Sequence, residues 1–182
     1  MEKFLLNSKE AVLLVIDIQD KLANIMKYKE QVIKNTNILI SASEEMDMPV
    51  LYTEQYPKGL GDTVQELRAR LENVKRFEKI TFSSYTEELR EELNAIGRKK
   101  VIITGMETHI CVLQTARDLI SNGYQVFIVS DGVCSRAKEN HLNGLSLMES
   151  MGAVITNTET VIFDLLKKAG TPEFKVLSKL IK

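Results

Sequence analysis

The chain has 182 residues, of which 44% are hydrophobic and 27% are charged, and its formal net charge at pH 7 is −1. This balance is typical of a globular protein that buries a sizeable core without disulfides or a structural metal. Its Lys and Arg residues are spread along the chain, so there is no electrostatic footprint for nucleic acid or a membrane surface, and we expect neither as a partner.

The cysteines and the apolar runs bear on location. Cys111 and Cys134 lie in different expected elements and form no C-x-x-C pair. Residues 1–6 have too few apolar positions for a signal-peptide core, and no apolar run approaches the roughly 18 residues of a membrane span. We therefore expect a cytoplasmic, reducing location in which thiols stay free.

Apolar strands alternate with amphipathic helices along the chain. Residues 11–18 (AVLLVIDI) are nearly all apolar, which is typical of a strand buried on both faces. Further strands are expected at residues 50–53, 73–78, 101–104, 124–130 and 153–155. Helices are expected at residues 21–46, 63–71, 85–96, 109–121, 138–151, 159–168 and 172–180, and turn-forming residues predict loops at 55–61 and 131–136.

This alternation predicts an α/β fold built from βαβ units. We expect a three-layer α/β/α architecture around a six-stranded, mostly parallel sheet. Right-handed crossovers favour a doubly wound sheet, with the order 3-2-1-4-5-6. There is no internal repeat, low-complexity tract or linker, so residues 1–182 are interpreted as a single domain.

Doubly wound sheets bind ligands at the carboxyl ends of the strands where the strand order reverses. Here that point lies between the first and fourth strands. Asp17 lies near the end of the first strand, Lys79 follows the third, and Cys111 falls in the first turn of the helix after the fourth. The three side chains should therefore face one crevice.

Cys111 is the candidate nucleophile of this crevice. Backbone N–H groups and the helix dipole, with Thr108 as N-cap, predict a thiol that ionises readily. Asp17 would act as its base, and Lys79 would keep Asp17 ionised and stabilise developing negative charge. The alternatives are that Cys111 is a small buried hydrophobe and that Asp17 caps a neighbouring helix.

The chain resembles the isochorismatase-like cysteine hydrolases over nearly its full length. The matching segments, in order, are residues 14–19 (LVIDIQ), Lys79 with residues 82–84 (FSS), residues 105–112 (GMETHICV), residues 129–133 (VSDGV) and residues 135–136 (SR). Residues 53–61 (TEQYPKGLG) are most similar to a metal-independent branch of the family. The ordered set carries the resemblance, since no single segment is specific.

The resemblance implies a catalytic triad of Asp17, Lys79 and Cys111. It also implies a cis peptide bond between Met106 and Glu107, with the N–H groups of Glu107 and Cys111 as the oxyanion hole. Isochorismatase itself lacks the cysteine, so Cys111 points to hydrolysis of a small amide-type substrate through a thioacyl-enzyme intermediate. Relatives are often dimers or larger, so a homo-oligomer is expected. The expected substrate pocket consists of Gln19, Gln55, Tyr56, Phe82, Met106 and Thr108.

The chain departs from the nicotinamidases of this family, which bind a metal through Asp and His residues after the second strand. Its only histidines, His109 and His141, do not follow that strand, so we expect no metal and no cofactor. His109 is interpreted as a helix-entry residue, His141 as a surface or packing residue of its helix, and Cys134 as a packing residue.

Other functions stay open. The chain could be a catalytically silent binding or assembly protein that keeps the old pocket. It could also be a redox-active thiol protein, although no resolving cysteine lies near Cys111 in the sequence. A nucleotide-binding Rossmann domain is disfavoured because the chain has no G-x-G-x-x-G.

Overall fold

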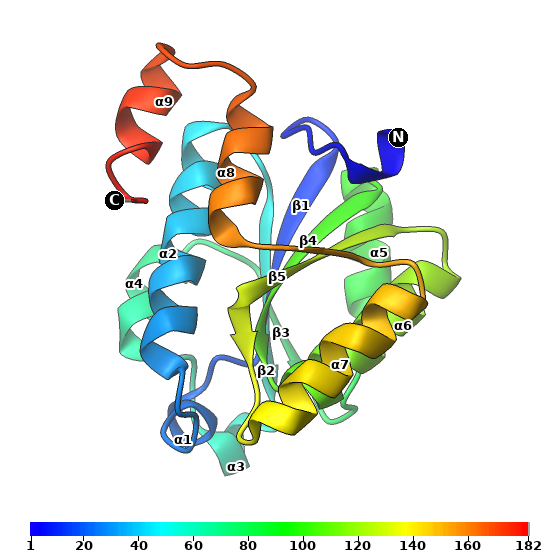
Figure 1. Cartoon of the computed structure of the whole chain (residues 1–182). Coiled ribbons are helices and arrows are strands. Elements are labelled where there is room, and N and C mark those ends of the chain that lie inside the picture. The colour runs from blue at the N-terminus through cyan, green and yellow to red at the C-terminus, as the bar shows by residue number, and fades with distance from the viewer. Residues whose placement is uncertain (182) are drawn as a thin grey trace.

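A computed structural model describes residues 1–181. Its centre is an all-parallel, six-stranded sheet with the order β3-β2-β1-β4-β5-β6 (Figure 1). The strands are β1 (Ala11–Ile16), β2 (Val50–Gln55), β3 (Arg76–Lys79), β4 (Lys100–Met106), β5 (Gln125–Cys134) and β6 (Val154–Thr156). The sheet lies between two layers of helices, so the predicted three-layer fold and strand order are confirmed.

The helices divide between the two faces of the sheet (Figure 1). They are α1 (Asp20–Ala23), α2 (Lys29–Glu45), α3 (Pro57–Leu60), α4 (Gln65–Leu71), α5 (Glu87–Ile96), α6 (Leu113–Ser121), α7 (Lys138–Ser150), α8 (Thr158–Leu166) and α9 (Pro172–Leu177). One face carries α2, α4 and α8, and the other carries α5, α6 and α7. None of the helices in residues 1–181 has the length and apolar character needed to span a bilayer.

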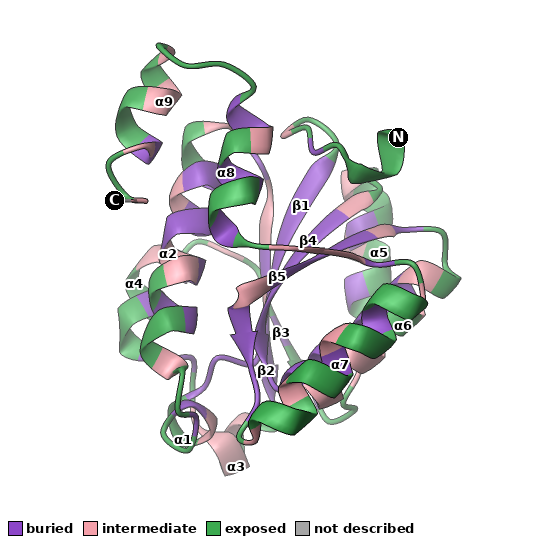
Figure 2. Cartoon of the chain, in the orientation of Figure 1, coloured by how far each residue is buried: buried purple, intermediate pink, exposed green. Residues whose placement is uncertain are grey.

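Strand β1 explains why the sheet has two cores. Its six residues are all buried, and successive side chains point to opposite faces. Leu13 and Val15 pack into the cluster that includes α2 and α8, whereas Leu14 and Ile16 pack into the cluster that includes α5 and α6. Figure 2 shows the result, with buried strands between helices whose outer faces are exposed.

Several predicted boundaries were wrong, each for a local reason. The helix expected at residues 21–46 is two helices, because the chain turns after α1 and buries Met26 while Ile25 stays exposed. The first strand ends at Ile16, since Asp17 has a left-handed backbone (φ 52°). The third strand begins only at Arg76, after a turn in which the Val74 N–H donates to the Leu71 carbonyl.

The loop expected at residues 131–136 is largely strand. Strand β5 runs on to Cys134 because its pairing with β4 resumes beyond a register shift, with Gly105 opposite Val133 and Met106 opposite Cys134. The loop expected at residues 55–61 contains the single turn of α3. Both differences lie at the carboxyl edge of the sheet, where the candidate site is built.

Candidate active site

The candidate residues lie at the carboxyl edge of the sheet, the end that carries α1 and α3 in Figure 1. Asp17 follows β1, and Lys79 is the last residue of β3. Cys111 lies in a π-helical turn, Thr108–Val112, between β4 and α6. Asp17 is 0% exposed, and Lys79 and Cys111 are each 5% exposed. The site is therefore shielded from bulk solvent.

Gly105 brings the ends of β1 and β4 together. Its φ is +137°, and a Cβ atom placed there would lie 2.0 Å from the carbonyl oxygen of Ile16. Only glycine permits so close an approach of the two backbones. The residues that follow, including Cys111, thus start directly beside the end of β1, where Asp17 lies.

Asp17 and Lys79 form a buried ion pair. The Lys79 Nζ lies 2.6 Å from Asp17 Oδ2, and the Thr53 hydroxyl donates to Asp17 Oδ1 over 2.7 Å. Burial raises the pKa of Asp17 above its ordinary value, and the charge and hydrogen bond of Lys79, with the hydrogen bond from Thr53, oppose this only in part. Two donors thus stabilise the carboxylate in a place from which water is excluded.

Lys79 has no proton to spare for a substrate. Its ammonium group has three N–H donors. Four oxygen acceptors surround it, namely Asp17 Oδ2 at 2.6 Å, Gln55 Oε1 at 2.8 Å and the carbonyl oxygens of Phe82 at 3.0 Å and Thr81 at 3.2 Å. Lys79 can therefore act through its charge and by holding residues 81–82, rather than as a proton donor.

The expectation that the Cys111 thiol ionises readily was wrong. Burial, together with the negative charge of Asp17, raises the pKa of the Cys111 thiol to about 12, and Lys79 opposes this only in part. The predicted Thr108 cap is also absent, because no side chain caps the π-helical turn and the Thr108 hydroxyl instead pairs with His141 Nδ1 at 2.9 Å. The sulfur therefore keeps its proton at neutral pH until a base removes it.

The segment before Cys111 is fixed by several side chains. The peptide bond between Met106 and Glu107 is cis. The buried Glu107 carboxylate accepts hydrogen bonds from the backbone and side-chain nitrogens of Arg136, at 3.0 and 3.2 Å. His109 Nδ1 pairs with the Ser135 hydroxyl at 2.9 Å. These contacts hold the backbone of residues 106–111 against the loop that follows β5.

Cys134 lies away from this chemistry. It packs in the core cluster on one face of the sheet, whereas Cys111 packs in the cluster on the other face. Burial, with the negative charge of Glu107, raises the pKa of the Cys134 thiol to about 12. Both thiols are free, and the sheet lies between them.

Comparison with known proteins identifies the family. The model of the isochorismatase domain matches residues 11–160. This chain belongs to the isochorismatase family. The secreted isochorismatase effector Isc1 of Phytophthora sojae is 42% identical over 177 residues, which cover 94% of this chain and 84% of that protein. The family resemblance predicted from the sequence is confirmed.

Two solved structures are similar to this isochorismatase-family protein over nearly its whole length. A structure titled as the MAR1 ribonuclease of Caenorhabditis elegans superposes with a TM-score of 0.92 and 38% identity, covering 97% of this chain and 92% of that one. The YcaC gene product of Escherichia coli, described as an octameric hydrolase of unknown specificity, gives a TM-score of 0.89. It is 22% identical and covers 97% of this chain and 90% of its own, so it supports the fold alone.

The residues predicted to line the substrate pocket divide into two groups in this isochorismatase-family protein. Gln19, Met106 and Thr108 are fully buried, and the Gln19 amide donates to the carbonyls of Gln55 and Gly61. Gln55 is buried and binds Lys79, whereas Tyr56 and Phe82 are more than half exposed. Their contact with a substrate stays a prediction.

Sequence reasoning missed three buried hydroxyl residues near Asp17, Lys79 and Cys111. Thr53 binds Asp17, Thr115 binds the Cys111 carbonyl at 2.6 Å, and Ser84 lies between them. The sequence carried one usable signal, since Thr115 lies four residues after Cys111, the spacing at which a helical threonine reaches back to a carbonyl. Thr53 and Ser84 lie in segments that carry the family resemblance, but no local spacing there indicates their hydrogen bonds.

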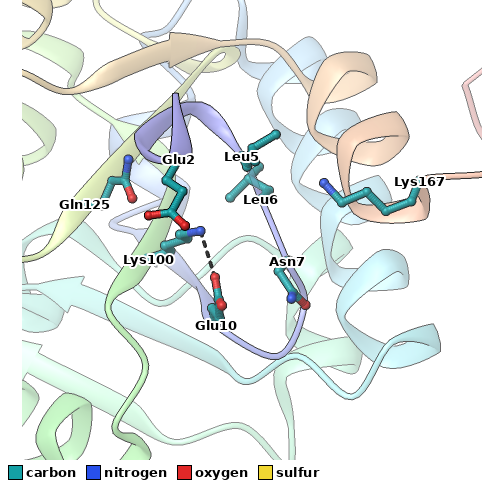
Figure 3. A pocket seen from close by; sticks show the side chains of 8 residues that line it. All are labelled: Glu2, Leu5, Leu6, Asn7, Glu10, Lys100, Gln125 and Lys167. Atoms are coloured by element: carbon teal, nitrogen blue, oxygen red, sulfur yellow. Dashed lines mark hydrogen bonds and ion pairs between the residues drawn. The ribbon is translucent and has the colours of Figure 1, made fainter.

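Other features lie apart from this site. The part of the chain that the structure describes holds no group of three or more His, Cys, Asp or Glu side chains arranged to hold a metal ion. A polar cavity of about 400 Å³ is lined by Glu2, Leu5, Leu6, Asn7, Glu10, Lys100, Gln125 and Lys167, with Lys100 paired to Glu10 (Figure 3). Its strand residues begin β4 and β5, so this cavity lies at the opposite edge of the sheet.

Proposed function

We propose that this isochorismatase-family protein is a cysteine-dependent hydrolase of a small amide-type substrate. The observation that carries the proposal is the buried Asp17–Lys79 ion pair beside the Cys111 thiol at the switch point of the sheet. A buried carboxylate next to a protonated thiol is a suitable general base, because its proton transfer can accompany attack of the sulfur on the substrate.

The proposed reaction begins with Asp17 accepting the Cys111 proton. The sulfur forms a bond to the substrate carbonyl carbon, and the electron pair of the C=O bond moves to its oxygen. The N–H groups of Glu107 and Cys111 would donate to this oxyanion. The C–N bond then breaks, the amine leaves with the proton from Asp17, and a thioester on Cys111 remains.

Water completes the cycle. Asp17 accepts a proton from the water molecule as its oxygen bonds to the thioester carbon. The C–S bond breaks, the carboxylic acid leaves, and the sulfur recovers its proton from Asp17. Lys79 gives up no proton in this scheme, in agreement with the four acceptors around its ammonium group. Its charge favours the ionised form of Asp17 between steps.

The test is a panel of small amides and ureides, with mass spectrometry of the intact protein for an acyl adduct. We expect Cys111→Ala to abolish turnover and adduct, and Cys134→Ala, the matched control, to retain both. Turnover that persists in Cys111→Ala would exclude the proposed nucleophile. Since the C. elegans relative is titled a ribonuclease, a single-stranded RNA substrate belongs in the panel. RNA cleavage that survives in Cys111→Ala would indicate a different activity.

The alternatives predict other results. A silent binding protein would show neither turnover nor adduct on any member of the panel. A redox thiol protein would need a partner sulfur, and Cys134 packs on the opposite face of the sheet.

We also propose a homo-oligomer, because Ile80 and Phe82 beside the site are exposed apolar residues and the E. coli relative is described as an octamer. Light scattering of the purified protein tests this directly.

A further inference from the structure

Three buried hydroxyl residues and one backbone N–H group form a line of contacts between Asp17 and the turn that carries Cys111. Thr53 on β2 donates to Asp17 Oδ1 over 2.7 Å. Its oxygen lies 3.4 Å from the Ser84 hydroxyl. The Ser84 backbone N–H donates to the Thr115 hydroxyl over 2.8 Å, and Thr115 on α6 donates to the Cys111 carbonyl over 2.6 Å. Thr53, Ser84 and Thr115 are 1%, 0% and 0% exposed.

In each hydrogen bond of this line, the donor and the acceptor can be assigned. The Asp17 carboxylate only accepts, so the single Thr53 proton is used there and Thr53 must accept from Ser84. The Cys111 carbonyl likewise only accepts, so the Thr115 proton is used there and Thr115 accepts the Ser84 N–H. In this assignment each hydroxyl proton of the line has one acceptor, namely Asp17 for Thr53, Thr53 for Ser84 and the Cys111 carbonyl for Thr115.

We propose that Thr53, Ser84 and Thr115 are positioning residues, which fix the Asp17 carboxylate and the Cys111 turn relative to each other through this one line of buried groups. This inference rests on the proposed function, because it assigns the line to the orientation of base and nucleophile. Proton transfer from sulfur to carboxylate depends steeply on the distance between them. The line ties that distance to β2, the segment at Ser84 and α6.

The π-helical turn makes the Thr115 contact important. In this wide turn the Val112 N–H donates to the backbone carbonyl of Glu107, five residues earlier in the chain. The ordinary pattern of helical hydrogen bonds is therefore interrupted around Cys111. Thr115 supplies the Cys111 carbonyl with a donor from the regular helix that follows. We expect the turn that carries the sulfur to shift toward solvent when that donor is removed.

The chain offers two matched controls. Thr104 on β4 and Thr36 on α2 are also 0% exposed, and within residues 1–181 neither hydroxyl has a hydrogen-bond partner. Thr104→Val therefore controls for Thr53→Val in a strand, and Thr36→Val controls for Thr115→Val in a helix. Each pair replaces a buried hydroxyl by a methyl group, and only one member of each pair breaks the line.

The experiment measures hydrolysis of the best amide from the panel against pH. We expect Thr53→Val to move the acid limb of kcat/KM to higher pH, since Asp17 loses a donor to its ionised form. Thr115→Val should lower kcat about tenfold or more at nearly unchanged KM and leave the acid limb in place. Thr53→Ser and Thr115→Ser, which keep the hydroxyl, should restore each property, and the two controls should behave as the parent protein.

A second readout needs no substrate. In a Cys134→Ala background, alkylation by iodoacetamide reports only Cys111. We expect Thr115→Val to accelerate alkylation about threefold or more, because the sulfur becomes more accessible, and Thr53→Val to slow it, because the freed Asp17 oxygen binds the thiol proton more strongly. Line variants that match their controls in both readouts would overturn the positioning role. Failure of the whole amide panel, with these alkylation changes present, would overturn the proposed function and leave the positioning role standing.

Discussion

The Nζ atom of Lys79 lies 2.6 Å from the Oδ2 atom of Asp17, and both side chains are almost completely buried. Such a pair loses much of the solvation of both ions, and its own attraction roughly offsets that loss. Its presence at the end of β1 is therefore poorly explained by stability alone. The proposed role of Asp17 as the base for the Cys111 thiol would explain why the pair is present.

Removal of the lysine tests the pair. Lys79→Met leaves the Asp17 carboxylate buried without its counter-ion, so we expect the free energy of unfolding to fall by about 3–5 kcal/mol and turnover to be lost. The double variant Asp17→Asn, Lys79→Met should recover much of the stability, since no charge stays unpaired, and none of the turnover. Urea unfolding measures the first quantity and amide hydrolysis the second.

The control for this prediction is Lys167→Met. Lys167 pairs with Asp164 at 2.8 Å, but about half of its side chain is exposed. We expect a change below about 1 kcal/mol, because exposed ion pairs contribute little. A loss at Lys79 no larger than the loss at Lys167 would show that the buried pair is not coupled as described.

Alkylation of Cys111 against pH tests the raised thiol pKa. Because the pKa of the Cys111 thiol is raised to about 12, the thiolate fraction should grow about tenfold for each pH unit between pH 7 and 9.5, without a plateau. Iodoacetamide labelling in a Cys134→Ala background measures this rate. A plateau near neutral pH would indicate a thiol that is ionised at rest.

Asp17→Asn separates two roles of the carboxylate, namely its effect on the pKa of the Cys111 thiol and its proposed action as the base. The negative charge of Asp17 raises the pKa of the Cys111 thiol, and the charge of Lys79 lowers it. Without the carboxylate, alkylation should therefore reach a given rate at lower pH, while hydrolysis is lost because its base is gone. An Asp17→Asn variant that hydrolyses amides at the parental rate would contradict the role of Asp17.

The sequence was sufficient for the architecture because its determinants are local. The apolar run at residues 11–16 and the alternation of strands and helices identify βαβ units, and crossover handedness then restricts the strand order. The positions of Asp17, Lys79 and Cys111 followed from the same logic, since the carboxyl ends of parallel strands share one edge. The errors in boundary came from turns and pairings that depend on tertiary contacts, as at Met26 and at Cys134.

The chemical properties of the site residues were harder to predict from the sequence than their positions in the fold. Whether Cys111 ionises depends on its burial and its distance from Asp17, and neither is encoded within a sequence window. The helix-dipole argument considered only the local helix and therefore gave the wrong direction for the thiol pKa. In the same way, the sequence around Lys79 does not indicate that its ammonium group donates to Gln55 and to the carbonyls of Thr81 and Phe82.

Phe82 offers a test of the predicted substrate pocket. Its carbonyl binds Lys79, while its side chain is more than half exposed next to the site. Phe82→Ala keeps the backbone contact and removes the ring, so we expect KM to rise several-fold with kcat nearly unchanged. Phe163→Ala on α8 is the control, because Phe163 is comparably exposed and lies on an element remote from Cys111. An unchanged KM in Phe82→Ala would remove this side chain from the pocket.

The two buried thiols predict a loss of stability at alkaline pH. Burial raises the pKa of both the Cys111 and Cys134 thiols from 9.0 to about 12, so the folded chain keeps two protons that the unfolded chain releases from about pH 8.5–9 upward. Since the unfolded state then binds fewer protons, the free energy of unfolding falls as pH rises, by up to about 1.4 kcal/mol per pH unit for each thiol. Below about pH 8 both thiols are protonated in the folded and the unfolded chain, so the free energy of unfolding no longer depends on their titration.

Urea unfolding under reducing conditions between pH 8 and 10 measures this slope. The range stops at pH 10 because burial also raises the pKa of Tyr85 and Tyr124, whose titration adds to the slope at higher pH. Cys134→Ala removes one of the two thiols and should reduce the slope by about half, whatever its effect on stability at pH 8. A free energy of unfolding that is independent of pH over this range would mean that both thiols ionise in the folded protein as they do in the unfolded chain.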